Sequence, residues 1–443
     1  MVCWLVPLIV LLPGVARAQE REVSISIEDA IRRAAPVSEE VDIATHAVRR
    51  AKSEATKADS GWYPQVTASA SYTHTFKSEY DGLFDNAPGG AGLSNLPFGR
   101  DNTWRFGIAI RQNVFGGGRT LAAGRSADAA RSAAAIQLSS ARAQAVLRAT
   151  EAYYDALLAD RRVKIASETL AQAERSRDQT DEGYREGRLS EFDLLRARVA
   201  VQTQEPVVTQ RKAERRLAFL HLKQVLDIPT WKSVELTSDL ATPPPIESAG
   251  KSTTLERASV RQARAQVRMS RAAVDVAQAE HYPSVDLTMD WGRVAYPKGT
   301  FPTWDDFRTN WTGGVMVTVP LFTGFRISKQ VSSAEESLAQ SRAKLRQAKK
   351  AARYDSEKAS SDISTAKALM DKSSAALVQA EKAHRIAALR YREGVSTELE
   401  VNDARLAVER AKLSQAQAAR DLRVAKVRMA LLGQLPLAAR GAP

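Results

Sequence analysis

Apolar and polar residues alternate with a period of two in four segments of the chain. In the first of these segments, apolar residues at positions 66, 68, 70 and 72 alternate with Thr and Ser. This period is typical of β-strands that have one apolar and one polar face. We therefore predict two β-hairpins, with strands at 65–74 and 103–114 in the first and at 284–292 and 310–320 in the second.

Long stretches without helix breakers follow each predicted hairpin. Between Arg119 and Tyr184 the only Gly or Pro residues are Gly124 and Gly183, and the stretch from Arg326 to Tyr391 contains neither. At a rise of 1.5 Å per residue, each predicted helix is about 100 Å long. Such helices need neighbours of similar length, and returning helices are predicted at 190–226 and 397–432. Shorter helices are predicted at 25–60 and about 254–280.

The chain carries an internal repeat with an offset of 207 residues, since 391 − 184 = 207. The four letters Tyr-Arg-Glu-Gly occur at 184–187 and again at 391–394, and the strand-to-helix corners match at the same offset. Matching blocks at one offset indicate duplication. We predict repeats at 19–227 and 252–436, a Pro-rich linker at 228–251 and a tail at 437–443.

Each Tyr-Arg-Glu-Gly block has the residues expected at the tip of a helical hairpin. Gly187 and Gly394 stand where a helix C-terminus favours a left-handed residue. Ser190 in the first tip, and Ser396 or Thr397 in the second, suit the N-terminus of the returning helix.

The first 18 residues have the pattern of a signal peptide cut before Gln19. The apolar run is short and contains Pro7 and Pro13, which disfavours a transmembrane anchor. The only cysteine, Cys3, lies in this segment. The mature chain is therefore predicted to lack disulfides, thiolate metal sites and thiol catalysis.

Basic residues outnumber acidic ones, with a formal net charge of +13. Removal of Arg17 with the signal peptide leaves 13 − 1 = +12. These charges are scattered along helices, which favours a solvated helix face, with attraction to phosphate-rich lipid as the alternative. An exported protein rarely meets nucleic acid, so no nucleic-acid partner is predicted.

The predicted strands have the length and period of transmembrane β-strands. Four strands cannot close, and open edges facing lipid cost several kcal/mol per unpaired group. The sequence therefore predicts a barrel shared among several chains, with the edge of a soluble sandwich as the alternative. Aromatic residues near the strand ends fit an interfacial belt: Tyr63, Trp104, Tyr282, Trp291, Trp304 and Trp311.

Several short motifs together resemble the outer membrane efflux protein family, the TolC-like channels. They are Ile-Ser-Ile-Glu-Asp-Ala at 25–30 with Pro36, Tyr-Pro at 63–64 and 282–283, Val-Phe-x-Gly at 114–117, Pro-Leu-Phe-x-Gly at 320–324, and Tyr-x-x-Gly at both tips. The resemblance implies a mainly α fold with a transmembrane β portion, built as a homotrimer with a 12-stranded β-barrel and a periplasmic α-barrel. It also implies an outer-membrane exit duct of a tripartite efflux pump or type I secretion system, which works with a periplasmic adaptor and an inner-membrane transporter.

The resemblance assigns roles to three groups of residues. The adaptor is expected to dock on the hairpin tips at Tyr184, Arg185, Glu186, Gly187, Leu189, Ser190, Tyr391, Arg392, Glu393, Gly394, Val395 and Thr397. Where the best-known relatives carry an acidic constriction, this chain has Lys382, His384, Arg385 and Arg390, which predicts a basic constriction unless these side chains point outward. The strand-to-helix corners are Phe115, Gly117, Arg119, Phe322, Gly324 and Arg326.

No catalytic, cofactor or metal site is predicted. The five histidines lack ligand spacing, and the glycines at 116–118 lack the Lys-Ser/Thr end of a phosphate loop. Asp81, Asp85 and Asn86 favour a polar turn over a calcium site. The competing functions are a stand-alone porin, which leaves the long hairpins unexplained, and a periplasmic coiled coil, which leaves the strands unexplained.

Overall fold

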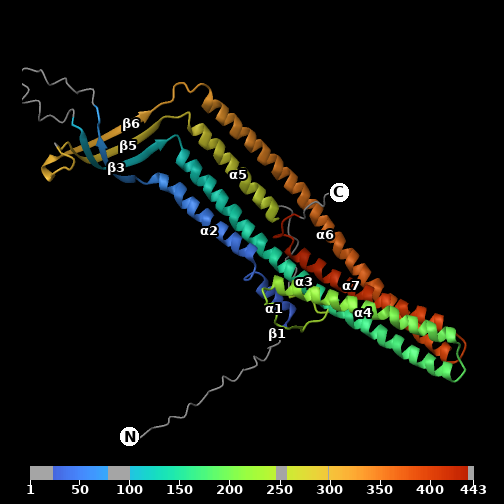
Figure 1. Ribbon diagram of the computed structural model, residues 1–443. Helices are drawn as coiled ribbons and strands as arrows, with labels where there is room; N and C mark the ends of the chain where they lie inside the picture. The colour runs from blue at the N-terminus through green and yellow to red at the C-terminus, as the bar shows by residue number, and fades with distance from the viewer. Residues whose placement is uncertain (1–22, 78–99, 246–256, 298, 438–443) are drawn as a thin grey trace, which may run out of the picture. The chain divides into compact units, whose positions relative to one another are not determined.

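The computed structural model describes residues 23–77, 100–245, 257–297 and 299–437 (Figure 1). The predicted signal peptide, the turn with Asp81, Asp85 and Asn86, residues 246–251 of the predicted linker and all but the first residue of the tail lie outside these ranges. The described chain is mainly helical with six short or medium strands, which confirms the prediction of a mainly α fold with a β portion.

The chain divides into two compact units. Unit 1 comprises Met1–Asp42, Ser140–Thr253 and Tyr354–Ala438, and unit 2 comprises Ile43–Ser139, Thr254–Arg353 and Ala439–Pro443. Each unit therefore combines segments from both predicted repeats. The two longest helices, α3 (Arg119–Arg185) and α6 (Arg326–Arg392), each contribute residues to both units.

Unit 1 is built from long helices and one small sheet. The first hairpin is α3 with α4 (Glu191–Val225), and the second is α6 with α7 (Glu398–Leu431). Strand β1 (Val23–Ile25) pairs in parallel with β4 (Val234–Leu236). The sequence missed both strands, because it placed Ile25 in a helix and 234–236 in a linker. Helix α1 (Ile27–Ala34) instead begins after the Ser26 cap.

The core of unit 1 is rich in alanine, which lets helices approach closely. Ala149, Ala152 and Ala156 of α3 are buried with Ala416 and Ala419 of α7. Two adjacent tyrosines of α3 hold the small sheet and its following loop.

The hydroxyl of Tyr153 donates to the carbonyl of Ile25 at 3.0 Å and accepts from the amide of Ser238 at 3.2 Å. The hydroxyl of Tyr154 donates to the carbonyl of Thr242 at 2.8 Å. Burial raises the pKa of Tyr154 to about 12, although Arg423 opposes the shift. Both side chains therefore stay neutral hydrogen-bonding groups at physiological pH.

Unit 2 contains the four-stranded antiparallel sheet. Its strands are β2 (Gln65–His74), β3 (Asn102–Gly116), β5 (Ser284–Ala295) and β6 (Phe307–Thr318), in the order β2-β3-β5-β6. All four were predicted, with β5 reaching three residues further than expected. Strand β6 begins earlier and ends two residues sooner than expected, just before Pro320, which has no amide hydrogen to donate.

The register of the sheet separates an apolar face from a polar one. Val66 pairs with Ile110, which pairs with Met289, and Ile108 pairs with Trp291, which pairs with Trp311. On the opposite face, Thr67, Asp290 and Thr312 lie in one row through Ala109. Every residue of β2 is exposed, and so is most of β6. In the described residues, the loop side chains Phe301 and Trp304 lie against the loop end of the apolar face, and most large apolar side chains of this face are exposed.

Helices flank the sheet in sequence. In unit 2 these are most of α2 (Glu39–Asp59), the first part of α3, α5 (Ala258–Ala279) and the first part of α6. The helix predicted at 25–60 is therefore two helices, which separate around Pro36.

No helix in the described residues has an apolar stretch long enough to cross a membrane.

Candidate functional site

The first hairpin tip joins the end of α3 to the start of α4. Gly187 has a φ of +73°, the left-handed conformation that ends many helices. The amide of Gly187 donates to the carbonyl of Tyr184 at 2.9 Å, and that of Arg188 donates to the carbonyl of Gly183 at 2.8 Å. Leu189 packs against Gly183, where an added Cβ would lie 2.7 Å from the Leu189 Cδ1 atom. Backbone bonds and one apolar contact therefore fix this turn.

Ser190 caps α4, as the sequence predicted. Its hydroxyl accepts from the Asp193 amide at 3.2 Å, and its own amide donates to the Asp193 carboxylate at 3.1 Å. The sequence missed Asp193, although its position three residues after the cap is that of the acid in a capping box.

The second tip repeats the turn with a different cap. Gly394 has a φ of +72°, and its amide donates to the carbonyl of Tyr391 at 3.0 Å. Of the two cap candidates, Thr397 takes the N-cap position and accepts from the Glu400 amide at 3.4 Å. Ser396 instead donates its hydroxyl to the Glu400 carboxylate.

Most side chains of the two tips are exposed. Arg185 lies 2.6 Å from the Asp181 carboxylate in a local ion pair, and Arg188 pairs with Glu186. Leu189 and Tyr391 are half-buried, whereas the other predicted docking residues are exposed: Tyr184, Arg185, Glu186, Gly187, Ser190, Arg392, Glu393, Gly394, Val395 and Thr397. The tips thus present a mixed polar and apolar surface on two hydrogen-bonded turns.

The two tips lie beside each other in unit 1 (Figure 1). Burial raises the pKa of Tyr391, and the nearby carboxylates of Glu398 and Asp193 add to that shift. Burial likewise raises the pKa of Glu398, with Arg196 opposing and Asp193 adding. Residues of α4 and α7 therefore share one electrostatic environment between the tips.

The residues of the predicted constriction do not all gather in one place within a single chain. His384 and Arg385 line a groove of about 500 Å³, whereas Lys382 and Arg390 are exposed and outside its lining. Burial lowers the pKa of His384, and the positive charge of Arg405 lowers it further. Near neutral pH the imidazole is therefore held in its uncharged form.

The groove also contains residues that the sequence did not single out. Arg405 of α7 donates to the carbonyl of Thr169 at 3.1 Å and to the Asn402 side chain at 2.6 Å. Lys412 lies 3.2 Å from the Glu168 carboxylate of α3. The spacing of 405, 409 and 412 puts them on one face of α7, but sequence alone does not say which helix that face meets.

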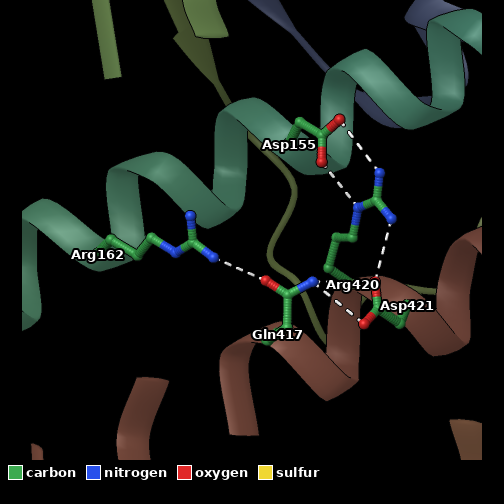
Figure 2. A network of polar contacts seen from close by, with 5 residues as sticks. All are labelled: Asp155, Arg162, Gln417, Arg420 and Asp421. Carbon is green, nitrogen blue, oxygen red and sulfur yellow. Dashed lines mark hydrogen bonds and ion pairs between the residues drawn. The ribbon is translucent and has the colours of Figure 1, made fainter. Parts of the chain in front are cut away.

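A polar network joins α3 to α7 further along the bundle (Figure 2). Arg420 donates to both carboxylate oxygens of Asp155, at 2.7 and 3.2 Å, and to Asp421 at 3.1 Å. Arg162 donates to the Gln417 side chain at 2.7 Å. Although burial disfavours the charged guanidinium, these ion pairs raise the pKa of Arg420. The network fixes the register between α3 of the first hairpin and α7 of the second.

The strand-to-helix corners of unit 2 are close-packed in one repeat and open in the other. Gly117 has a φ of +62°, and an added Cβ would lie 2.6 Å from the Ala279 carbonyl oxygen. Gly324 has a φ of +60°, and a Cβ added there would meet no other atom within 4 Å. Arg326 donates to the Glu280 carboxylate at 2.9 Å.

The remaining predicted corner residues are one arginine, Arg119, and two phenylalanines, Phe115 and Phe322. The Glu280 carboxylate has its pKa lowered mainly by the hydrogen bond from Arg326, with Arg119 contributing through its charge. Phe115 and Phe322 are both exposed. The two corner arginines therefore act on one carboxylate, while the two phenylalanines have no shared contact in the described residues.

The described residues bring no three His, Cys, Asp or Glu side chains into a group that could hold a metal ion. The arrangement offers instead two exposed turns, one polar groove and a sheet with a largely exposed apolar face. These features can support binding and assembly.

Comparison with known protein families gives one match that covers most of the chain. Residues 30–226 and 251–434 match the family described as outer membrane efflux protein. Over 247 residues the chain is 25% identical to Protein CyaE of Bordetella pertussis. That alignment covers 55% of this chain and 52% of CyaE, so the chain spans about half the length of this curated relative.

Solved structures with the same fold include three outer-membrane proteins. The outer membrane protein VceC of Vibrio cholerae is 20% identical, with a TM-score of 0.76 over 92% of this chain and 95% of that one. The Campylobacter jejuni CmeC outer membrane channel is 17% identical, with a TM-score of 0.78 over 94% and 87%. The Neisseria gonorrhoeae MtrE outer membrane channel, solved in an open state, is 18% identical, with a TM-score of 0.76 over 92% and 89%.

Proposed function

The chain belongs to the outer membrane efflux protein family, whose members are channels of the outer membrane, and we propose that it is the exit duct of a tripartite efflux pump or type I secretion system. In this role it passes substrates from a periplasmic adaptor and an inner-membrane transporter to the outside. The duct moves solutes through a pore and performs no bond chemistry.

The main support for this proposal is the sheet of unit 2, whose apolar face is largely exposed. Its outer strands β2 and β6 each have one edge without a partner in the described residues. Unpaired backbone groups in lipid cost several kcal/mol each, so the sheet requires further strands. Three copies supply 3 × 4 = 12 antiparallel strands, because β2 and β6 run in opposite directions and can pair between copies.

The long helical hairpins also support the role of an exit duct. Helices of this length have no role in a pore that only crosses the membrane, whereas a duct that meets a periplasmic partner needs them. The two tips of each chain, and so six per trimer, form the docking surface for the hairpins of an adaptor. Their exposed turns at 184–190 and 391–397 support this role.

We propose that any narrow point near the second tip is basic in this protein. Lys382, Arg385 and Arg390 are exposed on α6, and a ring of three copies would triple their charge. Such a ring disfavours cations by electrostatic repulsion. Cation selectivity of the purified channel in a planar bilayer would rule this arrangement out.

Site-specific photo-cross-linking in living cells tests the proposal. A photo-reactive amino acid replaces Arg185 or Arg392, and a matched control places it at Arg216, an exposed position of α4 about 40 Å from the tip. We expect both tip positions, and not the control, to capture a periplasmic adaptor identified by mass spectrometry. Cross-links confined to copies of this chain during active export would favour a stand-alone channel.

A further inference from the structure

Arg293 is a charged residue on the apolar face of the sheet. It lies in β5 between Phe106 of β3 and Thr309 of β6. Among the strand positions that share this face in the four described strands, it is the only Asp, Glu, Lys or Arg. A charged residue on a lipid-facing surface is costly unless it serves a function or reaches the interface.

The guanidinium of Arg293 is held by aromatic rings. It lies 5.2 Å from the centre of the Trp304 ring and 5.5 Å from that of Phe307. Its Nε atom is buried and has no hydrogen-bond partner in the described residues, and no carboxylate there forms an ion pair with it. The rings therefore position the cation without neutralising it.

Other aromatic side chains gather at the same end of the sheet. Phe106 contacts Phe307 with ring centres 5.6 Å apart, and Trp104 contacts Phe301 at 5.9 Å. This is the end of the strands that carries the connecting loops, whereas the opposite end leads into the helices. Arg293 is two residues from the loop end of β5, or about 7 Å along the strand. Its position fits the level of lipid head groups.

We propose that Arg293 binds a phosphate group of a phosphorylated lipid in the outer leaflet of the outer membrane. The Nε atom is buried, so the edge formed by the two terminal nitrogens of the guanidinium, Nη1 and Nη2, is the one that suits two phosphate oxygens at once. Thr309, directly across the ladder and exposed, provides a hydroxyl donor on the same face. The proposal rests on the proposed membrane-spanning trimer, in which this face meets lipid.

The polar face offers a matched control at the same height. Arg105 of β3 and Arg308 of β6 both pair with Val294, the neighbour of Arg293 in β5. Arg308 therefore differs from Arg293 in the face it occupies and hardly in its distance from the loop end. Replacing it removes the same charge from the side that faces away from lipid.

Native mass spectrometry of the detergent-solubilised full-length protein tests the site with lipid A as the probe. The wild type is titrated with lipid A, with dephosphorylated lipid A and with inorganic phosphate. The variants are R293Q, R293K and the control R308Q. We expect the wild type to prefer lipid A to its dephosphorylated form, and R293Q to weaken lipid A binding about fivefold or more. R308Q should bind as the wild type does, and R293K should fall between them.

Three outcomes would overturn the proposal. One is equal wild-type binding of lipid A and dephosphorylated lipid A, which needs no variant to fold. Another is an equal loss in R293Q and R308Q, which indicates a general charge effect. The third is inorganic phosphate displacing lipid A at equal affinity, which identifies a site for the free ion. Conductance of the same wild-type sample in a planar bilayer reports separately on the channel.

Discussion

Replacing Gly117 with alanine should damage the protein far more than the same change at Gly324, the matching corner of the second repeat. Both glycines have positive φ values, at +62° and +60°. An alanine in this left-handed region costs about 1–2 kcal/mol at either position. The backbone conformation alone therefore predicts the same loss of stability for both variants.

The surroundings of the two corners separate them. A Cβ at Gly117 would lie 2.6 Å from the carbonyl oxygen of Ala279 and 2.8 Å from the Cβ of Tyr282, whereas a Cβ at Gly324 meets nothing within 4 Å. Relieving such contacts requires α5 and the following turn to shift, which adds about 1–3 kcal/mol. We expect a total of about 2–5 kcal/mol for G117A and about 1–2 kcal/mol for G324A.

The assay compares the two variants for the amount of assembled protein in the outer membrane and for the apparent Tm of the purified protein, followed by circular dichroism. G117A should assemble poorly or have a Tm several degrees below that of G324A. Equal behaviour of the two variants, or a fully stable G117A, would refute the idea that close packing at the first corner requires glycine.

Three further predictions concern unit 1. The hydrogen bonds from Arg148 lower the pKa of Glu40 to about 2 from its usual 4.5. This pair therefore stabilises the folded protein above about pH 4.5, and the stabilisation is lost as the pH falls towards 2. The Tm difference between the wild type and E40Q should shrink over that range, and a constant difference would contradict this. Y153F removes a buried hydroxyl with two hydrogen bonds and should lower the free energy of unfolding by about 1–3 kcal/mol in denaturant titrations; no change would show that the hydroxyl is dispensable. In a double-mutant cycle with R420M and D155N, we expect a coupling energy of about 1–2 kcal/mol, reduced because Asp155 is partly exposed; strictly additive effects would show that the pair contributes nothing.

The strands and hairpins of this protein are predictable because their patterns are local. The period-two segments became β2, β3, β5 and β6, and the glycines at the tips took the left-handed conformation that their positions indicate. The repeat also showed which corners and tips correspond, but not their different surroundings. Nothing in the local sequence distinguishes the close-packed Gly117 from the open Gly324.

Contacts between distant segments could not be predicted. Val23 pairs with Val234, and each strand of that sheet has only three residues, too few for a visible period. Asp155 and Arg420 are 265 residues apart, and their contact depends on how α3 packs against α7. The groove around Arg405 depends on the same packing. Arg293 stood within a predicted strand, but its importance became visible only when the register placed it on the apolar face.

Disulfide trapping between copies tests whether three chains close one membrane barrel. Because Cys3 is the only cysteine and lies in the predicted signal peptide, a T67C change on the edge strand β2 can be combined with single cysteines along β6. T312C and G314C lie on the same face of the sheet as Thr67, and the cysteine-free mature chain is the control. We expect one of these pairs, oxidised in intact cells, to give a covalent trimer with no larger products. No cross-link at any β6 position in membrane-inserted protein, or a ladder that continues beyond three chains, would contradict it.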